Sequence, residues 1–175
     1  MEIQNKGDTM IYTIIALVLL VADQVVKYLV RTGIDLGQSI PFIPHLLDLT
    51  FVRNTGAAFS MLEEHTWVLI LISAVVVVVV AVLTARKVFQ GWLGLTAAML
   101  VMCGGIGNLI DRVVLGYVTD MFQTTFMNFA VFNLADCYIT VGVVLLFIYV
   151  LFFYPEPNQK EVDPHADCDL PGDGH

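Results

Sequence analysis

The stretch Gly104–Asp136, GGIGNLIDRVVLGYVTDMFQTTFMNFAVFNLAD, joins two long apolar segments of the chain. Because each flanking segment is long enough to cross a bilayer, the stretch begins and ends at the same membrane face. Holding polar groups at the edge of hydrocarbon costs free energy, so residues of this kind are usually paired or functional. The polar and ionisable residues at the mouths of these segments are Asn108, Arg112, Asp120, Asn133 and Asp136.

The composition of the whole chain places it in the membrane. Of its 175 residues 58% are hydrophobic and 14% are charged, and the mean hydropathy is +0.80. A soluble domain has roughly 45–50% apolar and about 25% charged residues. The excess forms four runs, each close to the roughly 20 residues that cross a bilayer. We predict an all-α membrane protein with spans at 11–30, 67–85, 92–110 and 135–154 in one domain, 1–154, followed by a disordered acidic tail at 155–175.

The segment between the first two spans is interrupted by Pro41, Pro44 and several glycines, so it does not form a helix of its own. Within it, Leu47–Val52 alternates apolar and polar residues for a short distance, as a half-buried strand does. We predict a small amphipathic sheet with its loop at 38–60, lying at the outer face of the membrane.

Four spans place both ends of the chain on one side of the membrane. With Lys27 and Arg112 set aside as motif residues, four cations fall on the terminal side and two on the other. The positive-inside rule therefore predicts cytoplasmic termini. The polar residues at the mouths of the spans all fall on the face opposite the termini: Asn54, Asn108, Arg112, Asp120 and Asp136. Asp23 and Lys27, four residues apart on one helix face, lie there too, with Asp23 submerged by roughly 10 Å below the end of its span at Val30.

Two other sets of residues are assigned to packing. Gly94, Gly104, Gly105 and Gly107 in the third span allow neighbouring helices to approach closely. Cys103, Cys137 and Cys168 share no metal-ligand spacing and are interpreted as small hydrophobic residues.

Two carboxylates at one membrane face suit acid–base chemistry. Like charges a few ångströms apart cannot both ionise, so Asp120 and Asp136 would share a proton, one activating water and the other donating to an oxygen. No histidine lies in a span, and two aspartates are too few for a metal site, so we expect no metal and no cofactor. No basic patch predicts nucleic-acid binding. Asn108, Arg112 and Asn133 could orient the dyad and the substrate; a plain interfacial pair with Asp111 is the alternative for Arg112, and Asp111 is kept outside the site. A small transporter and a lipid-binding scaffold are the alternatives that the residues alone leave open.

Five short blocks follow one another along residues 11–154: Asp23-x-x-x-Lys27, Asn54–Phe59 (NTGAAF), Gly107–Arg112 (GNLIDR), Val118–Asp120 (VTD) and Phe132–Asp136 (FNLAD). In order and spacing they resemble the motif blocks of the bacterial lipoprotein signal peptidase (signal peptidase II) family. Each block alone is weak, and their combination on a four-span chain is specific.

The resemblance implies an intramembrane aspartyl endopeptidase with Asp120 and Asp136 as its catalytic dyad. Its substrates would be prolipoproteins with a diacylglyceryl group on the lipobox cysteine, cut on the N-terminal side of that cysteine. Asn54, Asn108, Arg112 and Asn133 would line the site and position substrate, and Asp23 and Lys27 would support the local structure.

The resemblance also implies a four-helix fold with an outer sheet in the bacterial cytoplasmic (inner) membrane, and cytoplasmic termini. We expect a monomer whose partners are prolipoproteins and membrane lipids. A carboxylate at a helix N-terminus is favoured when ionised, so we expect Asp136 to be the resting anion. Asp120, on a less regular segment, would then hold the shared proton.

Overall fold

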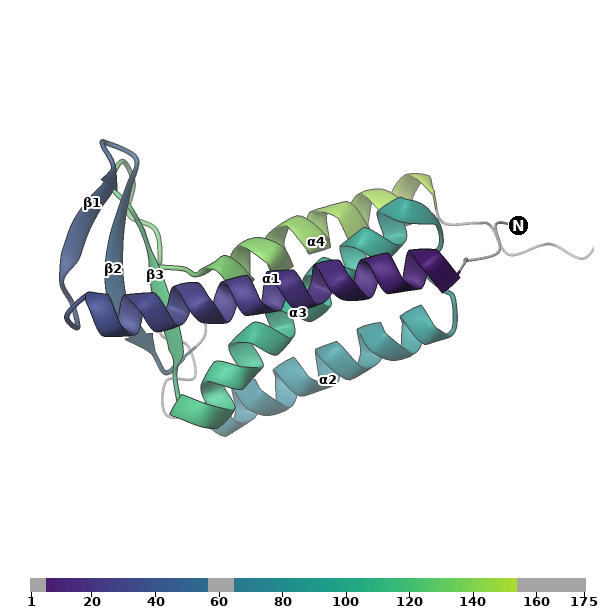
Figure 1. The fold of residues 1–175 in the computed structure, drawn as a ribbon, viewed down its shortest axis with the longest axis horizontal. Helices are drawn as coiled ribbons and strands as arrows, with labels where there is room; N and C mark the ends of the chain where they lie inside the picture. The colour runs from purple at the N-terminus through teal and green to yellow at the C-terminus, as the bar shows by residue number, and fades with distance from the viewer. Residues whose placement is uncertain (1–5, 57–64, 154–175) are drawn as a thin grey trace, which may run out of the picture.

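The computed structural model describes residues 6–56 and 65–153. The predicted tail at 155–175 and the end of the predicted sheet region, 57–60, lie outside these residues. Four helices of the described chain are long and apolar enough to cross a membrane. With a small antiparallel sheet at one end of these helices (Figure 1), the fold is the predicted all-α membrane protein.

The four helices follow the predicted spans closely. They are α1 (Lys6–Gly33), α2 (Thr66–Ala85), α3 (Gly91–Leu115) and α4 (Leu134–Phe152). Helix α1 begins five residues before the predicted Ile11 and ends three residues after Val30, and α3 continues five residues beyond the predicted Ile110. Helix α3 ends where Gly116 takes a left-handed conformation, with φ 81°. Asp111 and Arg112 therefore lie on the helix, with side chains that point in different directions.

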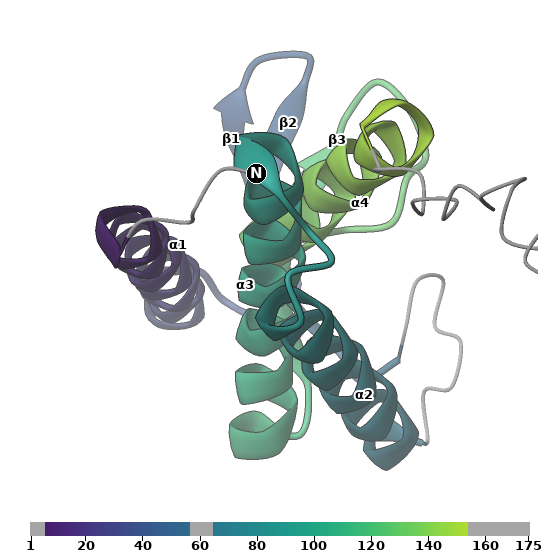
Figure 2. The ribbon, with the colours of Figure 1, turned by 90° about the vertical axis from the view of Figure 1, so that its right-hand side faces the viewer.

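Helix α3 lies in the middle of the bundle, with α1, α2 and α4 around it (Figure 2). Its glycines confirm the packing interpretation, because a methyl group on each would meet a different neighbour. At Gly107 it would lie 2.6 Å from Asp23 Oδ2 of α1, and at Gly105 2.9 Å from Val77 Cγ2 of α2. At Gly104 it would collide with the backbone oxygen of Ala135, at the start of α4.

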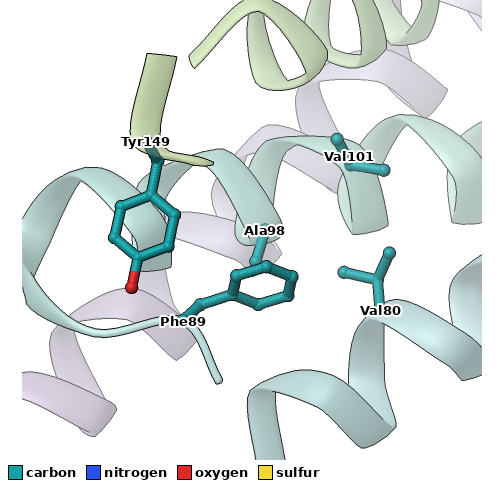
Figure 3. Close-up of a cluster of buried hydrophobic side chains, with 5 residues drawn as sticks. All are labelled: Val80, Phe89, Ala98, Val101 and Tyr149. Atoms are coloured by element: carbon teal, nitrogen blue, oxygen red, sulfur yellow. The ribbon is translucent and has the colours of Figure 1, made fainter. Parts of the chain in front are cut away.

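An apolar cluster closes the end of the bundle that lies away from the sheet (Figure 3). The Phe89 and Tyr149 rings meet edge to face, with centroids 6.3 Å apart. The Tyr149 hydroxyl accepts the backbone N–H of Gln90 at 2.9 Å and donates to Val88 O at 3.2 Å. These bonds fix the short α2–α3 connection against α4.

The sheet contains β1 (Ser39–Ile43), β2 (Leu47–Asn54) and β3 (Val118–Thr124), in the order β1-β2-β3 with both pairings antiparallel. The first two strands lie within the predicted 38–60 region. The third strand was missed, and the expectation that Asp120 lies on a less regular segment is wrong. The first four residues of β3 are all buried, so the strand has no alternating pattern to reveal it.

The sheet lies where α1 and α3 end and α4 begins (Figure 1). Val30 of α1, Phe51 of β2 and Met121 of β3 form the apolar cluster that fastens the sheet to the bundle. Since α1 continues to Gly33, Asp23 lies ten residues before the end of the helix, or about 15 Å along its axis. The polar residues of α1, α3 and α4 therefore meet below the sheet.

Candidate active site

Asp120 lies in the middle of β3 and is almost fully buried, with 2% of its surface exposed. Two asparagine side chains donate to its carboxylate. Asn54 Nδ2 lies 2.8 Å from Oδ2, and Asn133 Nδ2 lies 2.7 Å from Oδ1. Val52 of β2 pairs with Asp120, and Asn54 lies two residues further along β2, so its side chain is on the same face of the sheet and diagonally next to Asp120.

Asp136 lies in the first turn of α4, as predicted, and takes part in a capping box with Asn133. Its Oδ2 accepts the backbone N–H of Asn133 at 3.0 Å, and its own N–H donates to Asn133 Oδ1 at 3.0 Å. Its other oxygen, Oδ1, accepts Asn108 Nδ2 from α3 at 2.7 Å. Free N–H groups at the start of a helix stabilise an ionised carboxylate.

Asn133 donates to both carboxylates, to Asp120 through its side-chain amide and to Asp136 through its backbone N–H. One end of its amide accepts from the N–H of Asp136 and the other donates to Asp120. It is 1% exposed. Rotation of this amide by 180° would break both bonds, so the side chain has one orientation only.

The other two asparagines are fixed in the same way. Asn108 Oδ1 accepts Lys27 Nζ at 2.9 Å while its Nδ2 donates to Asp136. Asn54 Oδ1 accepts the N–H of Gly56 at 3.0 Å while its Nδ2 donates to Asp120. In each case a donor holds the carbonyl side of the amide and directs the NH₂ group to a carboxylate.

Asp23 and Lys27 lie behind this layer rather than in it. Both are fully buried, and Lys27 Nζ lies 3.0 Å from Asp23 Oδ2. The other oxygen of Asp23 accepts the backbone N–H of Ala135 at 3.0 Å, in the first turn of α4. Lys27 reaches Asp136 only through Asn108. The supporting role that the family resemblance implied for this pair stays a prediction.

Arg112 does not pair with Asp111, which excludes the alternative of an interfacial pair between these neighbours. Its Nη2 donates to Gly56 O at 3.3 Å, and its buried Nε has no hydrogen-bond partner among the described residues. Asp111 turns the other way, toward Lys27 and Arg31, each at 3.7 Å.

A cavity of about 960 Å³ opens beside the two carboxylates. It lies between the sheet, α3 and α4, and most of its wall is apolar. Its polar lining residues are Arg53, Asn54, Thr55, Ser73, Asn108, Arg112, Asp120, Asn133, Asp136 and Thr140. Six of the eight predicted site residues therefore face one space, and Asp23 and Lys27 do not.

Burial raises the pKa of Asp120 to about 6, from the ordinary value of 3.8. The hydrogen bonds from Asn133 and Asn54 act in the opposite direction, and the nearby charge of Asp136 adds to the rise. A carboxyl group in this range exchanges its proton close to neutral pH, as a general acid must.

Sequence reasoning missed two residues near the site. Asp111 stands next to Arg112 in the sequence, and that proximity concealed its partners on α1. Arg53 lies at the cavity, with its guanidinium 5.1 Å from the centre of the Tyr117 ring and 5.7 Å from that of Phe51. The available signal was aromatic. Phe51 stands two positions before Arg53, and Tyr117 directly follows Gly116.

Comparison with known proteins agrees with the geometry. A family model described as Signal peptidase (SPase) II matches residues 15–152. The lipoprotein signal peptidase of Streptococcus agalactiae serotype Ia is 44% identical over 140 residues, 79% of this chain and 90% of the relative. That of Enterococcus faecalis is 44% identical over 144 residues, 81% and 88% of the two chains. A solved bacterial membrane enzyme superposes with a TM-score of 0.77 at 32% identity, over 86% of this chain and 93% of that one.

Fold and cavity together define a multi-pass helical membrane protein with two carboxylates at one end of its bundle. The matched segment contains α2, α3, α4, the whole sheet and α1 from residue 15 onward. The chain belongs to the signal peptidase II family, a family of peptidases.

Proposed function

We propose that the chain is an intramembrane aspartyl endopeptidase that removes signal peptides from diacylglyceryl-modified prolipoproteins. It cuts on the N-terminal side of the lipidated cysteine and uses Asp120 and Asp136 to activate water. The observation that carries this proposal is that both carboxylates face one apolar-walled cavity and both accept hydrogen bonds from Asn133, Asp120 from its side-chain amide and Asp136 from its backbone N–H. The relatives named lipoprotein signal peptidase support the class of substrate.

The hydrogen bonds support different resting states for the two carboxylates. Asp136 accepts a backbone N–H and the Asn108 amide at the start of a helix, so it is the anion and the base. Asp120 is more deeply buried and has a raised pKa, so it holds the proton.

The reaction then proceeds in two steps. Asp136 takes a proton from water, the water oxygen bonds to the scissile carbonyl carbon, and Asp120 gives its proton to the carbonyl oxygen. In the second step the C–N bond breaks, Asp136 returns its proton to the leaving nitrogen, and Asp120 recovers a proton from a hydroxyl of the intermediate. The dyad ends the cycle in its starting state, and no metal or cofactor takes part.

The remaining side chains hold the dyad and the substrate. Asn54, Asn108 and Asn133 keep the carboxylates oriented, and Arg112 presents at the cavity a buried Nε that has no partner within residues 6–56 and 65–153. That N–H is free to bind a carbonyl oxygen of the substrate. Asp23 and Lys27 support the dyad from behind.

The cavity is reached from within the bilayer, where the lipid of the substrate and surrounding membrane lipids lie. We place the protein in the bacterial cytoplasmic membrane as a monomer, with the sheet and site near the outer face and the termini in the cytoplasm. The charge distribution along the chain supports this orientation, because Arg86 and Lys87 connect α2 and α3 at the end opposite the sheet.

The proposal is tested with purified protein in lipid and a diacylglyceryl-modified prolipoprotein. Asp120→Asn and Asp136→Asn should each abolish release of the signal peptide, while Asp35→Asn, an exposed aspartate at the same end of the bundle, should cleave like the wild type. The unmodified prolipoprotein should remain uncut. Cleavage by either dyad variant at the wild-type rate would remove that residue from the mechanism, and no cleavage by the wild type would favour a transporter or a scaffold.

A further inference from the structure

Asp111 is buried at the sheet end of α3, with 1% of its surface exposed. Its Oδ2 accepts the backbone N–H of Thr119 at 2.9 Å. Thr119 is itself fully buried and directly precedes Asp120 on β3. One carboxylate of the helix thus holds the peptide group next to a predicted catalytic aspartate.

The same arrangement occurs at the other member of the dyad. Asp23 accepts the backbone N–H of Ala135 at 3.0 Å, and Ala135 directly precedes Asp136. Two buried aspartates on different helices therefore bind equivalent backbone groups, each one residue before a dyad aspartate. Neither lines the cavity, so neither meets the substrate.

Lys27 lies between these two carboxylates. Its Nζ is 3.0 Å from Asp23 Oδ2 and 3.7 Å from Asp111 Oδ2. Arg31 supplies the second positive charge, 3.7 Å from Asp111 Oδ1, and donates to Thr119 Oγ1 at 2.9 Å. The negative charges of Asp23 and Asp111 are thus matched by the positive charges of Lys27 and Arg31, since unpaired charges in the interior of a protein are costly. Gln24 Nε2 adds hydrogen bonds of 3.1 Å to Asp23 and 3.5 Å to Asp111.

The local backbone gives a reason why Asp120 needs this support. The pairing of β2 with β3 is irregular between Leu49 and Val52, and regular pairing resumes only at Val52, opposite Asp120. Only Gly116, in a left-handed conformation, and Tyr117 separate α3 from β3. The Asp111–Thr119 bond spans this bend and ties the strand to the helix that carries Asn108.

We propose that Asp111 is a positioning residue for Asp120, equivalent to Asp23 for Asp136, and that Lys27 couples the two. This inference rests on the proposed function, since it concerns the placement of the proposed dyad. The two dyad aspartates come from a strand and a helix that are far apart in sequence. Their relative placement is therefore set by the two buried side chains behind them, each of which accepts the backbone N–H of the residue before a dyad aspartate, with the Lys27 ammonium between the two.

The test compares Asp111→Ala, Asp111→Asn and the exposed control Asp35→Asn, all in the full chain and in lipid. Asparagine keeps an oxygen that accepts the Thr119 N–H but lacks the charge, and alanine lacks both. Both Asp111 variants should therefore lose thermal stability relative to the control. In the folded fraction, alanine should lower kcat by about 10- to 100-fold with little change in KM, because a small misplacement of a reacting group has an effect of that size. Asparagine should retain much more of kcat.

Hydrogen exchange supplies a readout that is independent of cleavage. The amide of Thr119 should exchange about tenfold faster in Asp111→Ala than in Asp111→Asn, since only the latter retains an acceptor. If Asp111→Ala does not fold, the asparagine variant decides alone, with near-normal kcat despite reduced stability as the expected result. Equal kcat in wild type and Asp111→Ala, equal loss of kcat in both variants, or an unchanged Thr119 exchange rate would overturn the inference. A wild type that does not cleave would instead contradict the proposed function.

Discussion

Replacement of Lys27 by methionine should destabilise the protein severely. The side chain is fully buried, and its ammonium forms ion pairs with both Asp23 and Asp111. At an effective dielectric constant of about 20, the distances of 3.0 and 3.7 Å correspond to gross attractions of about 5 and 4 kcal/mol. Desolvation of the lysine offsets much of this, and measured losses for breaking a buried pair are about 3–5 kcal/mol.

We expect the upper part of that range for Lys27→Met, because two carboxylates lose a partner at once. The free energy of unfolding in mixed micelles is the measurement, and Lys87→Met, an exposed lysine in the α2–α3 connection, is the matched control. The control should change stability by less than about 0.5 kcal/mol. Adding Asp23→Asn to Lys27→Met should recover part of the loss, because it removes one unpaired buried charge.

A loss below about 1 kcal/mol for Lys27→Met would refute this reasoning, since it would mean that Asp23 and Asp111 are neutral or solvated without the lysine. A double variant less stable than Lys27→Met would refute the pairing with Asp23. Cleavage should fall together with stability, because Asn108 loses the donor that directs its amide to Asp136.

Three further predictions concern single positions. Gly107→Ala should destabilise by about 1–3 kcal/mol in the same unfolding measurement, because its methyl would lie 2.6 Å from Asp23 Oδ2, while Gly33→Ala, with open space around it, should not. Asn133→Ser should retain the cap of α4 but lose the donor to Asp120, so cleavage activity should fall far more than stability. Asn133→Ala should lose the donor and the cap, and loss of the cap should lower the free energy of unfolding by about 1 kcal/mol. Burial raises the pKa of Asp120 from 3.8 to about 6 in the folded protein, so the protonated carboxyl contributes up to about 3 kcal/mol of stability below about pH 4, and this contribution is lost as pH rises through 6. The free energy of unfolding of Asp120→Asn should not show this decrease between pH 4 and 6.

The helices and most of the site could be predicted because their signals are local. A run of apolar residues specifies a span whatever surrounds it, and the glycines of α3 marked a face of close approach. Asp23 and Lys27 lie four residues apart on one helix, so their pairing followed from the sequence alone.

The parts that were missed depend on distant segments. Strand β3 forms because β2 offers a pairing edge, and its buried residues carry no periodic pattern. The partners of Asp111 on α1 are far from it in the sequence. Its partner on β3, Thr119, is eight residues away, on the strand that was missed.

The place of Asp136 on α4 has a consequence for biosynthesis. Asn108, Asn54, Asp120 and the Asp23–Lys27 pair all precede this helix in the chain, and every bond that orients Asp136 crosses to one of them or to its own cap. The pair of carboxylates is thus incomplete while the first three helices are made and inserted. Under the proposed mechanism, a ribosome-bound chain at that stage lacks one of the two proposed catalytic aspartates, and it would become competent only when its fourth helix enters the bilayer and docks on α3.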